Sequence, residues 1–415
     1  MTPEIKQRIE QIRRGEVPEG YVKKSKVVIP QQWRLPQIKD IASISSGSTP
    51  NRNNSEYWNG NIAWVTTGEL SSGHVNHTSE LITVKAVKET KMRIYPQGTL
   101  LMAMYGQGKT RGTVAILEID AAVNQACAAI TIKNGNSKFL FYQLKNSYQD
   151  IRKLSNIGNQ ENLNADIIKT YQVPWAPDEE QERISTILTA QDKVIELKEK
   201  RLAEKQRQKK YLMQQLLTGK KRLPGFSGAW KTDRLGKLFF ERKETNCENL
   251  EMLAITGTQG IIPRKELDLK DNSSEDKSKY LRVCVGDIGY NTMRMWQGVS
   301  AYSNYEGIVS PAYTILKPSS SINAKYFAYL FKMPEIVFLF YRFSQGLVDD
   351  TRNLKYENFK KIKVCYPPDM KEQTAIVEVL STADHEIDLL QQDIEQEKQK
   401  KKTLMQLLLT GIVRV

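Results

Sequence analysis

Residues 103–110, "AMYGQGKT", end in Gly108-Lys109-Thr110, the residue types that close a phosphate-binding loop. In such a loop the lysine and the threonine contact nucleotide phosphates and Mg²⁺ at the N-terminus of a helix. The first glycine of that pattern is replaced here by Ala103, and the residues that follow, "RGTVAILEID", are typical of a strand. The stretch therefore does not favour a nucleotide site.

The same stretch also fits a basic loop between two strands. Lys109 and Arg111, with Thr110 between them, would then lie where a DNA phosphate or a guanine edge can be bound. A plain hairpin without a function fits these residues equally well, so both interpretations stay open.

Two further groups of residues are of the types that hold metal ions. His74 and His77 have a suitable spacing, but no third ligand accompanies them, and solvated loop histidines are several times more common. The triplets Glu-Thr-Lys at 89–91 and Asp-Leu-Lys at 268–270 fit a nuclease centre, yet a chain with 26% charged residues contains such triplets freely. No methyltransferase tetrad and no glycine-rich cofactor loop occurs. We therefore predict no catalytic residue, no metal site and no cofactor on this chain.

Length and charge limit the class of protein. A chain of 415 residues is long enough for two or three domains, each with its own core. The net charge of +14 and the isoelectric point of about 9.3 favour a polyanionic partner, most often nucleic acid. A basic surface that only maintains solubility explains the charge equally well.

The four cysteines, Cys127, Cys247, Cys284 and Cys365, are far apart in the sequence and form no CxxC pair. We expect them to be reduced, buried thiols rather than disulfides or zinc ligands. No apolar run reaches the roughly 18 residues of a membrane span, and the first residues lack the apolar centre of a signal peptide. These features predict a cytoplasmic protein.

The chain contains an internal repeat. Residues 212–219 read "LMQQLLTG" and residues 404–411 read "LMQLLLTG", and the agreement extends without gaps when 180–219 is placed on 372–411. Each copy begins after a proline-bearing break with acidic residues that suit the first turn of a helix. Each copy also ends at a glycine suited to C-capping, Gly219 or Gly411.

The repeated segment has the apolar spacing of a heptad helix. In the second copy the positions that alternate by four and three are Ile376, Leu380, Ala383, Ile387, Leu390, Ile394, Glu397, Lys401, Leu404 and Leu408. One such helix cannot bury its own apolar stripe, so the two copies should pack on each other. A parallel pair would bring Lys209 against Lys401, whereas an antiparallel pair places these lysines near Ala383 and Gln191. We therefore predict an antiparallel pair.

The segments upstream of the two helices share landmarks but little else. Trp33 and Trp230 open them, and "KFLFYQLK" at 138–145 corresponds to "KYFAYLFK" at 325–332. Because these aromatic residues recur in both copies, we expect core packing rather than base stacking. The stretches between the landmarks differ, which predicts two surfaces that recognise two different things on a common frame.

Four features carry a resemblance to a known family. They are "SGSTPNRNNSEYWNGNIAWVTTGEL" at 46–70, "NQACAAI" at 124–130, the proline-led helix starts and the two repeated octets. Over nearly its full length the chain resembles the specificity subunit of type I restriction-modification systems. The second domain departs from the pattern, because residues 310–312 read Ser-Pro-Ala where 124–126 read Asn-Gln-Ala.

The resemblance implies a mixed α/β fold with pseudo-twofold symmetry, in which two globular α/β target recognition domains are separated by two long antiparallel coiled-coil helices. The implied boundaries are 1–30 for an N-terminal helical segment that docks near the second long helix, 31–178 and 223–368 for the two recognition domains, and 179–222 and 369–415 for the two long helices.

The resemblance also implies a function without chemistry on this chain. The protein would hold two adenine-N6 methyltransferase subunits on a bipartite double-stranded DNA target and recruit ATP-driven restriction subunits, with S-adenosylmethionine and ATP bound by those partners. The candidate DNA contacts are Ser48, Thr49, Arg52, Asn53, Lys109, Thr110, Arg111, Arg264, Lys265, Arg294 and Gln297, and the candidate partner contacts are Leu212, Leu216, Leu404 and Leu408. A coiled-coil scaffold without DNA binding and the DNA-binding part of a fused restriction-methylation enzyme are the alternatives.

Overall fold

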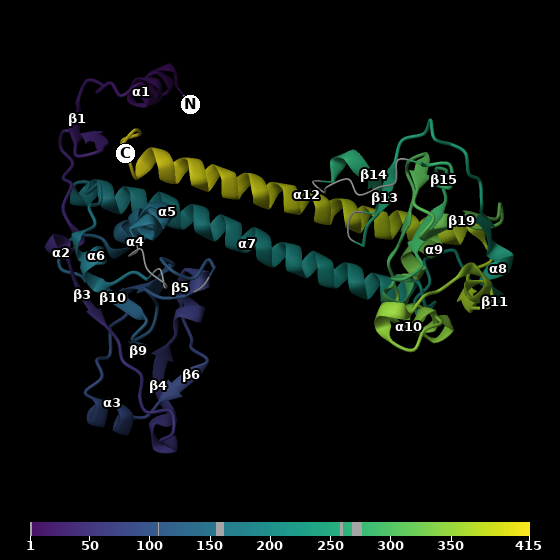
Figure 1. Ribbon diagram of the computed structural model, residues 1–415, viewed down its shortest axis with the longest axis horizontal. Helices are drawn as coiled ribbons and strands as arrows, with labels where there is room; N and C mark the ends of the chain where they lie inside the picture. Colours follow the sequence, from purple (N-terminus) through teal and green to yellow (C-terminus); the bar gives the residue numbers. More distant parts are fainter. Residues whose placement is uncertain (1, 107, 155–161, 258–259, 268–275) are drawn as a thin grey trace. The chain divides into compact units, whose positions relative to one another are not determined.

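The computed structural model describes residues 2–106, 108–154, 162–257, 260–267 and 276–415 (Figure 1). The chain forms two compact units. The first unit contains Met1–Lys198 and Asp393–Val415, and the second contains Glu199–Gln392. Each long helix of the sequence repeat contributes one part to each unit.

The first unit is built on a five-stranded sheet with the order β3-β10-β7-β8-β5. These strands are β3 (Ala42–Ser46), β5 (His74–Val75), β7 (Leu100–Ala103), β8 (Val114–Leu117) and β10 (Cys127–Ile132). A three-stranded sheet contains β6 (Glu80–Ile82), β4 (Trp58–Val65) and β9 (Ala121–Val123), and β1 (Tyr21–Lys24) pairs with β2 (Val27–Pro30). The shorter helices are α1 (Pro3–Arg13), α2 (Ile38–Ile41), α3 (Val84–Thr90), α4 (Ser137–Asn146), α5 (Tyr148–Lys153) and α6 (Ala165–Thr170).

The second unit is built on a four-stranded sheet with the order β12-β19-β16-β17. Its strands are β12 (Phe239–Arg242), β16 (Ile288–Asn291), β17 (Ser300–Tyr302) and β19 (Tyr313–Pro318). Three further antiparallel pairs are β11 (Lys231–Arg234) with β20 (Lys363–Tyr366), β13 (Leu253–Ile255) with β14 (Ile261–Pro263), and β15 (Leu281–Val283) with β18 (Gly307–Val309). The shorter helices are α8 (Leu235–Leu238), α9 (Ala324–Leu330), α10 (Pro334–Phe343) and α11 (Tyr356–Phe359).

The two units share one frame, as the sequence landmarks predict. The order β3-β10-β7-β8 corresponds to β12-β19-β16-β17, and in each unit the sheet is followed by a pair of helices, α4–α5 or α9–α10. Asn136 and Asn323 cap the first helix of each pair, and their backbone N–H groups donate to Gln181 and Gln373 at 3.0 and 2.7 Å. The aromatic residues that recur in both copies are buried or half-buried, so the expectation of core packing is confirmed.

The repeated segments form the helices α7 (Asp178–Leu216) and α12 (Met370–Leu408), each of 39 residues. Their first turns carry acidic residues, which oppose the positive end of the helix dipole. All ten heptad positions predicted in the second copy are buried or half-buried, so the heptad assignment is confirmed. Gly219 and Gly411 follow the helices with φ angles of +72° and +71°, the left-handed conformation expected of a C-cap.

The helices pair antiparallel, and the repeated lysines show why. Lys401 forms an ion pair with Asp192 in the first unit, and Lys209 forms the equivalent pair with Asp384 in the second. The direction is therefore as predicted, while each lysine binds the aspartate one residue beyond the expected neighbour, Gln191 or Ala383. An aspartate at this position converts a lysine that would disturb an apolar seam into a specific contact.

A tyrosine from the sheet domain of each unit completes these ion pairs. The hydroxyl of Tyr142 donates to Asp192 at 2.8 Å, and that of Tyr329 donates to Asp384 at 2.6 Å. The lysine ammonium groups lie 5.5 and 5.7 Å from the centres of the two tyrosine rings. In both units a tyrosine, an aspartate and a lysine thus join the sheet domain to α7 and α12.

Carboxylates between the helices make the stability of the chain depend on pH. Hydrogen bonds from Lys198 and from Gln191, with the nearby lysine charges, lower the pKa of Glu397 to about 2. A glutamate whose pKa is lowered on folding contributes stability above its unfolded pKa of about 4.3, and this contribution is lost as pH falls towards the folded value. We expect the melting temperature of the parent to fall between pH 4.5 and 2, and the Glu397→Gln variant to lose less over this range. Equal losses in parent and variant, measured by circular dichroism, would contradict this assignment.

Equivalent hydrogen bonds in both units fasten the starts of the long helices. Glu180 accepts hydrogen bonds from Arg414 at 2.6 and 2.9 Å and from the Trp33 indole at 2.8 Å. Glu372 accepts hydrogen bonds from two nitrogens of Arg222, Nε and Nη2, at 2.5 and 2.7 Å. In the N-terminal segment, the Tyr21 hydroxyl donates to the Gly411 carbonyl at 2.7 Å.

The cysteines are all free thiols, but the expectation that they are all buried is wrong. Cys127 is buried, and burial raises the pKa of its thiol to about 12. Cys247 and Cys284 are half-buried and Cys365 is exposed on β20. Among the described residues no helix has the length and apolar character needed to cross a membrane.

Candidate nucleic-acid interface

The loop that links β7 to β8 holds the basic residues singled out in the first domain. A strand, not a helix, follows Gly108-Lys109-Thr110, which confirms that this is no phosphate-binding loop. The loop is held by α5, because the Tyr148 hydroxyl donates to the Lys109 carbonyl at 2.6 Å. The Lys109 side chain is exposed and Thr110 is half-buried. Lys109 is therefore presented to solvent on an anchored loop.

Arg111 occupies a different environment from Lys109. Its side chain is only 8% exposed, and its carbonyl accepts a hydrogen bond from Arg152 at 2.9 Å. In this conformation Arg111 presents little surface to a partner, and its part in DNA binding stays a prediction. The sequence did not indicate this difference, because both residues are basic and lie in the same turn.

The topologically equivalent loop of the second unit links β16 to β17. It contains the short helix η4 (Met295–Gln297), and both Arg294 and Gln297 are exposed. The Leu354 N–H donates to the Thr292 carbonyl at 2.9 Å, as the Leu163 N–H donates to the Met104 carbonyl at 3.0 Å in the first unit. Lys109 and Arg294 thus lie on corresponding loops that are tethered in the same way.

The polar motif at 46–70 forms a second surface of the first unit. Ser48 is half-buried, while Thr49 and Asn53 are exposed, and Thr49 hydrogen-bonds to Gln125. Two indoles fix this loop, since Trp64 donates to the Ser48 carbonyl at 3.1 Å and Trp58 donates to the Asn51 carbonyl at 3.2 Å. The tryptophans of the motif therefore hold its backbone in place.

Arg52 is exposed on this loop and forms an ion pair there. Both branches of its guanidinium pair with Glu80, one of them at 3.0 Å, and its carbon lies 4.2 Å from the centre of the Trp58 ring. The hydrogen bond from Arg52 lowers the pKa of Glu80. A cavity of about 160 Å³ beside this pair is lined by Arg52, Trp58, Asn59, Ser79, Glu80 and Leu81. A base contact by Arg52 would have to compete with this ion pair.

Arg264 and Lys265 lie on the short helix η3 (Arg264–Glu266), directly after β14. Arg264 is half-buried and Lys265 is exposed. Lys265 pairs with Glu251 at 2.6 Å, and this hydrogen bond raises the pKa of the lysine. Because η3 follows the two-stranded pair β13–β14, the Lys265 side chain is open to solvent.

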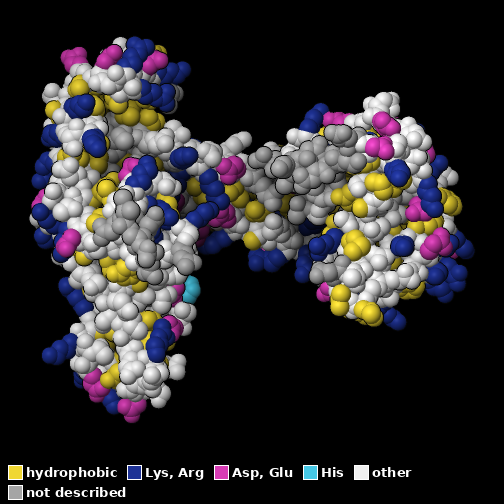
Figure 2. Space-filling model, viewed as in Figure 1, with side chains coloured by type: hydrophobic (Ala, Val, Ile, Leu, Met, Phe, Trp, Pro, Cys, Tyr) yellow, Lys and Arg dark blue, Asp and Glu magenta, His cyan; other side chains and the backbone are white. Residues whose placement is uncertain are grey.

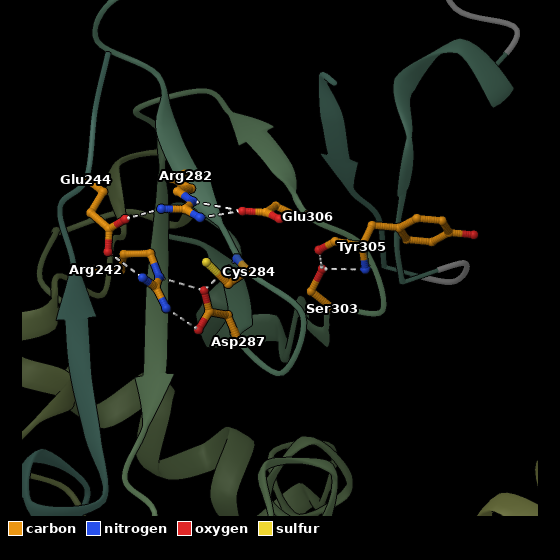
Figure 3. A network of polar contacts seen from close by, with 8 residues as sticks. All are labelled: Arg242, Glu244, Arg282, Cys284, Asp287, Ser303, Tyr305 and Glu306. Carbon is orange, nitrogen blue, oxygen red and sulfur yellow. Dashed lines mark hydrogen bonds and ion pairs between the residues drawn. The ribbon is translucent and has the colours of Figure 1, made fainter. Parts of the chain in front are cut away.

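Figure 3 shows a polar network in the second unit that sequence inspection did not find. Arg242 on β12 bonds the buried Asp287 through two nitrogens at 2.7 and 3.1 Å. Glu244 accepts hydrogen bonds from Arg242 and from Arg282, and Arg282 also bonds Glu306 at 2.5 and 3.0 Å. These partners are up to 45 residues apart, so only the folded chain brings them together. The network braces β12, β15 and the turns beside them.

Of the four leucines predicted as partner contacts, two are buried in the cores of this chain and two are half-buried. Leu216 and Leu408 are 3% and 2% exposed in the cores of the second and first units, and Leu212 and Leu404 pack half-buried against the same cores. In this conformation Leu216 and Leu408 present no surface to another subunit, and their repetition is explained by core packing.

No cluster of three or more metal-ligating side chains occurs in the part of the chain that the structure describes. His74 pairs with Glu118 at 2.9 Å, and His77 bonds the neighbouring Asn76 at 2.6 Å. At 89–91, Glu89 accepts a hydrogen bond from Tyr57 at 2.7 Å. The triplet at 268–270 lies outside the described residues.

Fold and surface together define a class of protein with two α/β recognition domains on one repeated frame, joined by two long antiparallel helices. The chain belongs to the family described as type I restriction modification DNA specificity domain, whose model matches residues 30–207 and 248–399.

Individual relatives agree with this assignment. The chain is 34% identical over 178 residues to the type I restriction enzyme MjaIX specificity subunit of Methanocaldococcus jannaschii, a match that spans 41% of this chain and 40% of that subunit. It is 24% identical to the putative type I restriction enzyme MjaX specificity subunit of the same organism, over 93% of this chain and 95% of the relative. The crystal structure of the type I restriction-modification S subunit from M. genitalium has the same fold, with a TM-score of 0.58 at 15% identity, covering 94% of this chain and 98% of that one.

Proposed function

We propose that the protein is the specificity subunit of a type I restriction-modification complex and recognises a bipartite DNA target, one half with each unit. The observation that carries this proposal is the duplicated frame with unlike exposed loops. Lys109 on the β7–β8 loop and Arg294 on the β16–β17 loop are exposed cations on corresponding loops, while the surrounding residues differ. A common frame with different loops suits two half-sites of different sequence.

The proposal includes partners that perform the chemistry. Two adenine-N6 methyltransferase subunits and the ATP-dependent restriction subunits would assemble on this chain, and S-adenosylmethionine and ATP would be bound by them. The specificity subunits among the relatives support this role. The scaffold alternative involves no DNA binding, so it does not explain why exposed cations lie on corresponding loops of both units.

The function is tested by mapping methylated adenines in host cells with and without this chain. We expect a bipartite methylated sequence that disappears when the gene is deleted and returns with the parent sequence. Methylation that persists without the chain would contradict the assignment as specificity subunit.

The role of the hairpin loops is tested by replacing Lys109 or Arg294 with alanine. Removing a cation that neutralises a DNA phosphate should weaken binding of the assembled methyltransferase and lower the log-log salt slope by about one unit. Binding of a duplex with the mapped target is measured by fluorescence anisotropy at several salt concentrations. Lys169→Ala is the matched control, because Lys169 is a half-buried lysine of α6 that pairs with Asp166 at 2.9 Å. Unchanged affinity and slope in both loop variants would show that these loops do not bind DNA.

A further inference from the structure

The helix that packs against the hairpin loop differs in character between the two units. In the first unit it is α5, "YQDIRK", whose exposed residues are polar. In the second it is α10, "PEIVFLFYRF", where only Phe340 is buried and Phe338 and Tyr341 are 58% and 41% exposed. Glu335 and Arg342 give this helix one polar side, but Phe338 and Tyr341 leave a large apolar surface beside it uncovered. Because the same frame accepts a polar helix in the first unit, the fold does not require the apolar surface of α10.

Three further exposed apolar side chains lie on the segments that flank α10. Met293 on the β16–β17 loop is 40% exposed, and in the turn after α10 Leu347 and Val348 are 99% and 59% exposed. Figure 2 shows hydrophobic side chains gathered on the surface of the second unit over α10. Single exposed apolar residues are ordinary, whereas a group on adjoining segments marks a binding surface.

The turn that carries Leu347 has a defined backbone. Gln345 and Asn353 exchange two backbone hydrogen bonds of 2.8 and 2.7 Å. Gly346 has a φ angle of +124°, and a Cβ atom there would lie 2.6 Å from the Thr351 carbonyl oxygen. Only glycine fits this position. The next residue, Leu347, therefore lies in a segment closed by a backbone pair and is almost fully exposed.

The same turn is fastened to the β16–β17 loop. The Leu354 N–H donates to the Thr292 carbonyl at 2.9 Å, and the Arg352 guanidinium lies 4.1 Å from the centre of the Tyr341 ring and 5.9 Å from that of Trp296. Leu347 is thus carried by the structure that presents Arg294 and Gln297.

We propose that Leu347 is an apolar wedge that enters a base step of the half-site recognised by the second unit, with Val348 beside it. This inference rests on the proposed function. Leucine and methionine side chains presented beside cations unstack base pairs in other DNA-binding proteins and kink the duplex. The exposed Arg294 and Arg342 favour DNA over an apolar protein as the occupant, and the neighbouring Asp349 is already paired with Arg352 at 3.5 Å. The first unit has no corresponding apolar helix among its described residues, so the distortion should be confined to one half-site.

The wedge is tested with Leu347→Ser and Val348→Ser in the assembled methyltransferase, using duplexes that carry 2-aminopurine at successive steps of the second half-site. The parent should raise 2-aminopurine fluorescence at one step, and Leu347→Ser should abolish the rise and weaken binding about tenfold. The salt slope should stay as in the parent, because an apolar contact releases no counterions. Val285→Ser is the matched control, since Val285 is 63% exposed in another turn of the same unit.

Both variants replace exposed side chains, so their melting temperatures should equal that of the parent. If the parent binds DNA normally and Leu347→Ser binds as tightly and raises 2-aminopurine fluorescence as much as the parent, the wedge alone is overturned. Unchanged DNA affinity together with weaker assembly with the methyltransferase would make the apolar surface a protein contact and also overturn it. Absence of salt-dependent DNA binding by the parent would instead refute the proposed function, and the wedge with it.

Discussion

Exchanging residues 230–368 for the corresponding segment of a relative is expected to change one half of the recognised DNA sequence and to leave the other half as it was. The physical reason is that each unit has its own hydrophobic core. The second core includes Leu216 and Leu217 from the end of the first long helix and Ile376 and Leu380 from α12, which remain in the hybrid and pack against the frame of the new segment. A relative with the same frame therefore brings its own loops without disturbing the first unit.

Methylated adenines mapped across the genome of cells that carry the hybrid would show the result. The reciprocal exchange of residues 33–177 is the control and should change the other half-site. If one exchange altered both half-sites, the two units would not recognise DNA independently. An unchanged target after both exchanges would place recognition outside the two segments.

Adding one heptad to each of α7 and α12 is expected to lengthen the spacer between the half-sites by about three base pairs. Seven residues extend a helix by about 10.5 Å, and one base pair occupies about 3.4 Å. A whole heptad keeps the seam in phase, so buried positions such as Ile387 and Ile394 keep apolar partners. Three base pairs also rotate the duplex by roughly a third of its 10.5-bp turn, so affinity should fall.

The half-site sequences should not change in the lengthened protein, because the inserted residues lie away from both sheets. Adding four residues to each helix is the control, since it puts the heptad pattern out of phase and should lower the melting temperature. Methylated-adenine mapping distinguishes the outcomes. Retained activity with the original spacing would mean that the helices hold partners without setting the spacer, and altered half-sites would mean that they shape the recognition domains.

The frame was predictable because its signals are local or repeated. Heptad spacing reflects the period of a helix, and the identity of Asp192 with Asp384 and of Lys209 with Lys401 shows that one set of contacts is made twice. The antiparallel direction followed from the cost of placing like charges together. The aspartate partners were present in the same repeat, but their contact with the lysines depends on the rotation of each helix.

The candidate DNA contacts were less predictable, because exposure is a property of the folded chain. Lys109 and Arg111 differ by two residues, yet the folded loop leaves the first in solvent and buries the second. The sequence around Arg52 offers no sign of its partner, and in the folded chain Arg52 is bound to Glu80, which is 28 residues away. No local pattern indicates such a partner.

By itself the sequence determined the internal repeat, the long helices, the absence of a recognisable catalytic motif and the family. These properties are encoded in spacing and residue type, which folding does not alter. The tertiary structure decided which basic side chains reach the surface, that Leu216 and Leu408 are core, and that Arg242, Arg282 and their carboxylates form one network. It also left Leu347 exposed in a closed segment that is fastened to the loop of Arg294. Burial and charge pairing arise between residues far apart in the chain, so they exist only once the strands and helices have assembled.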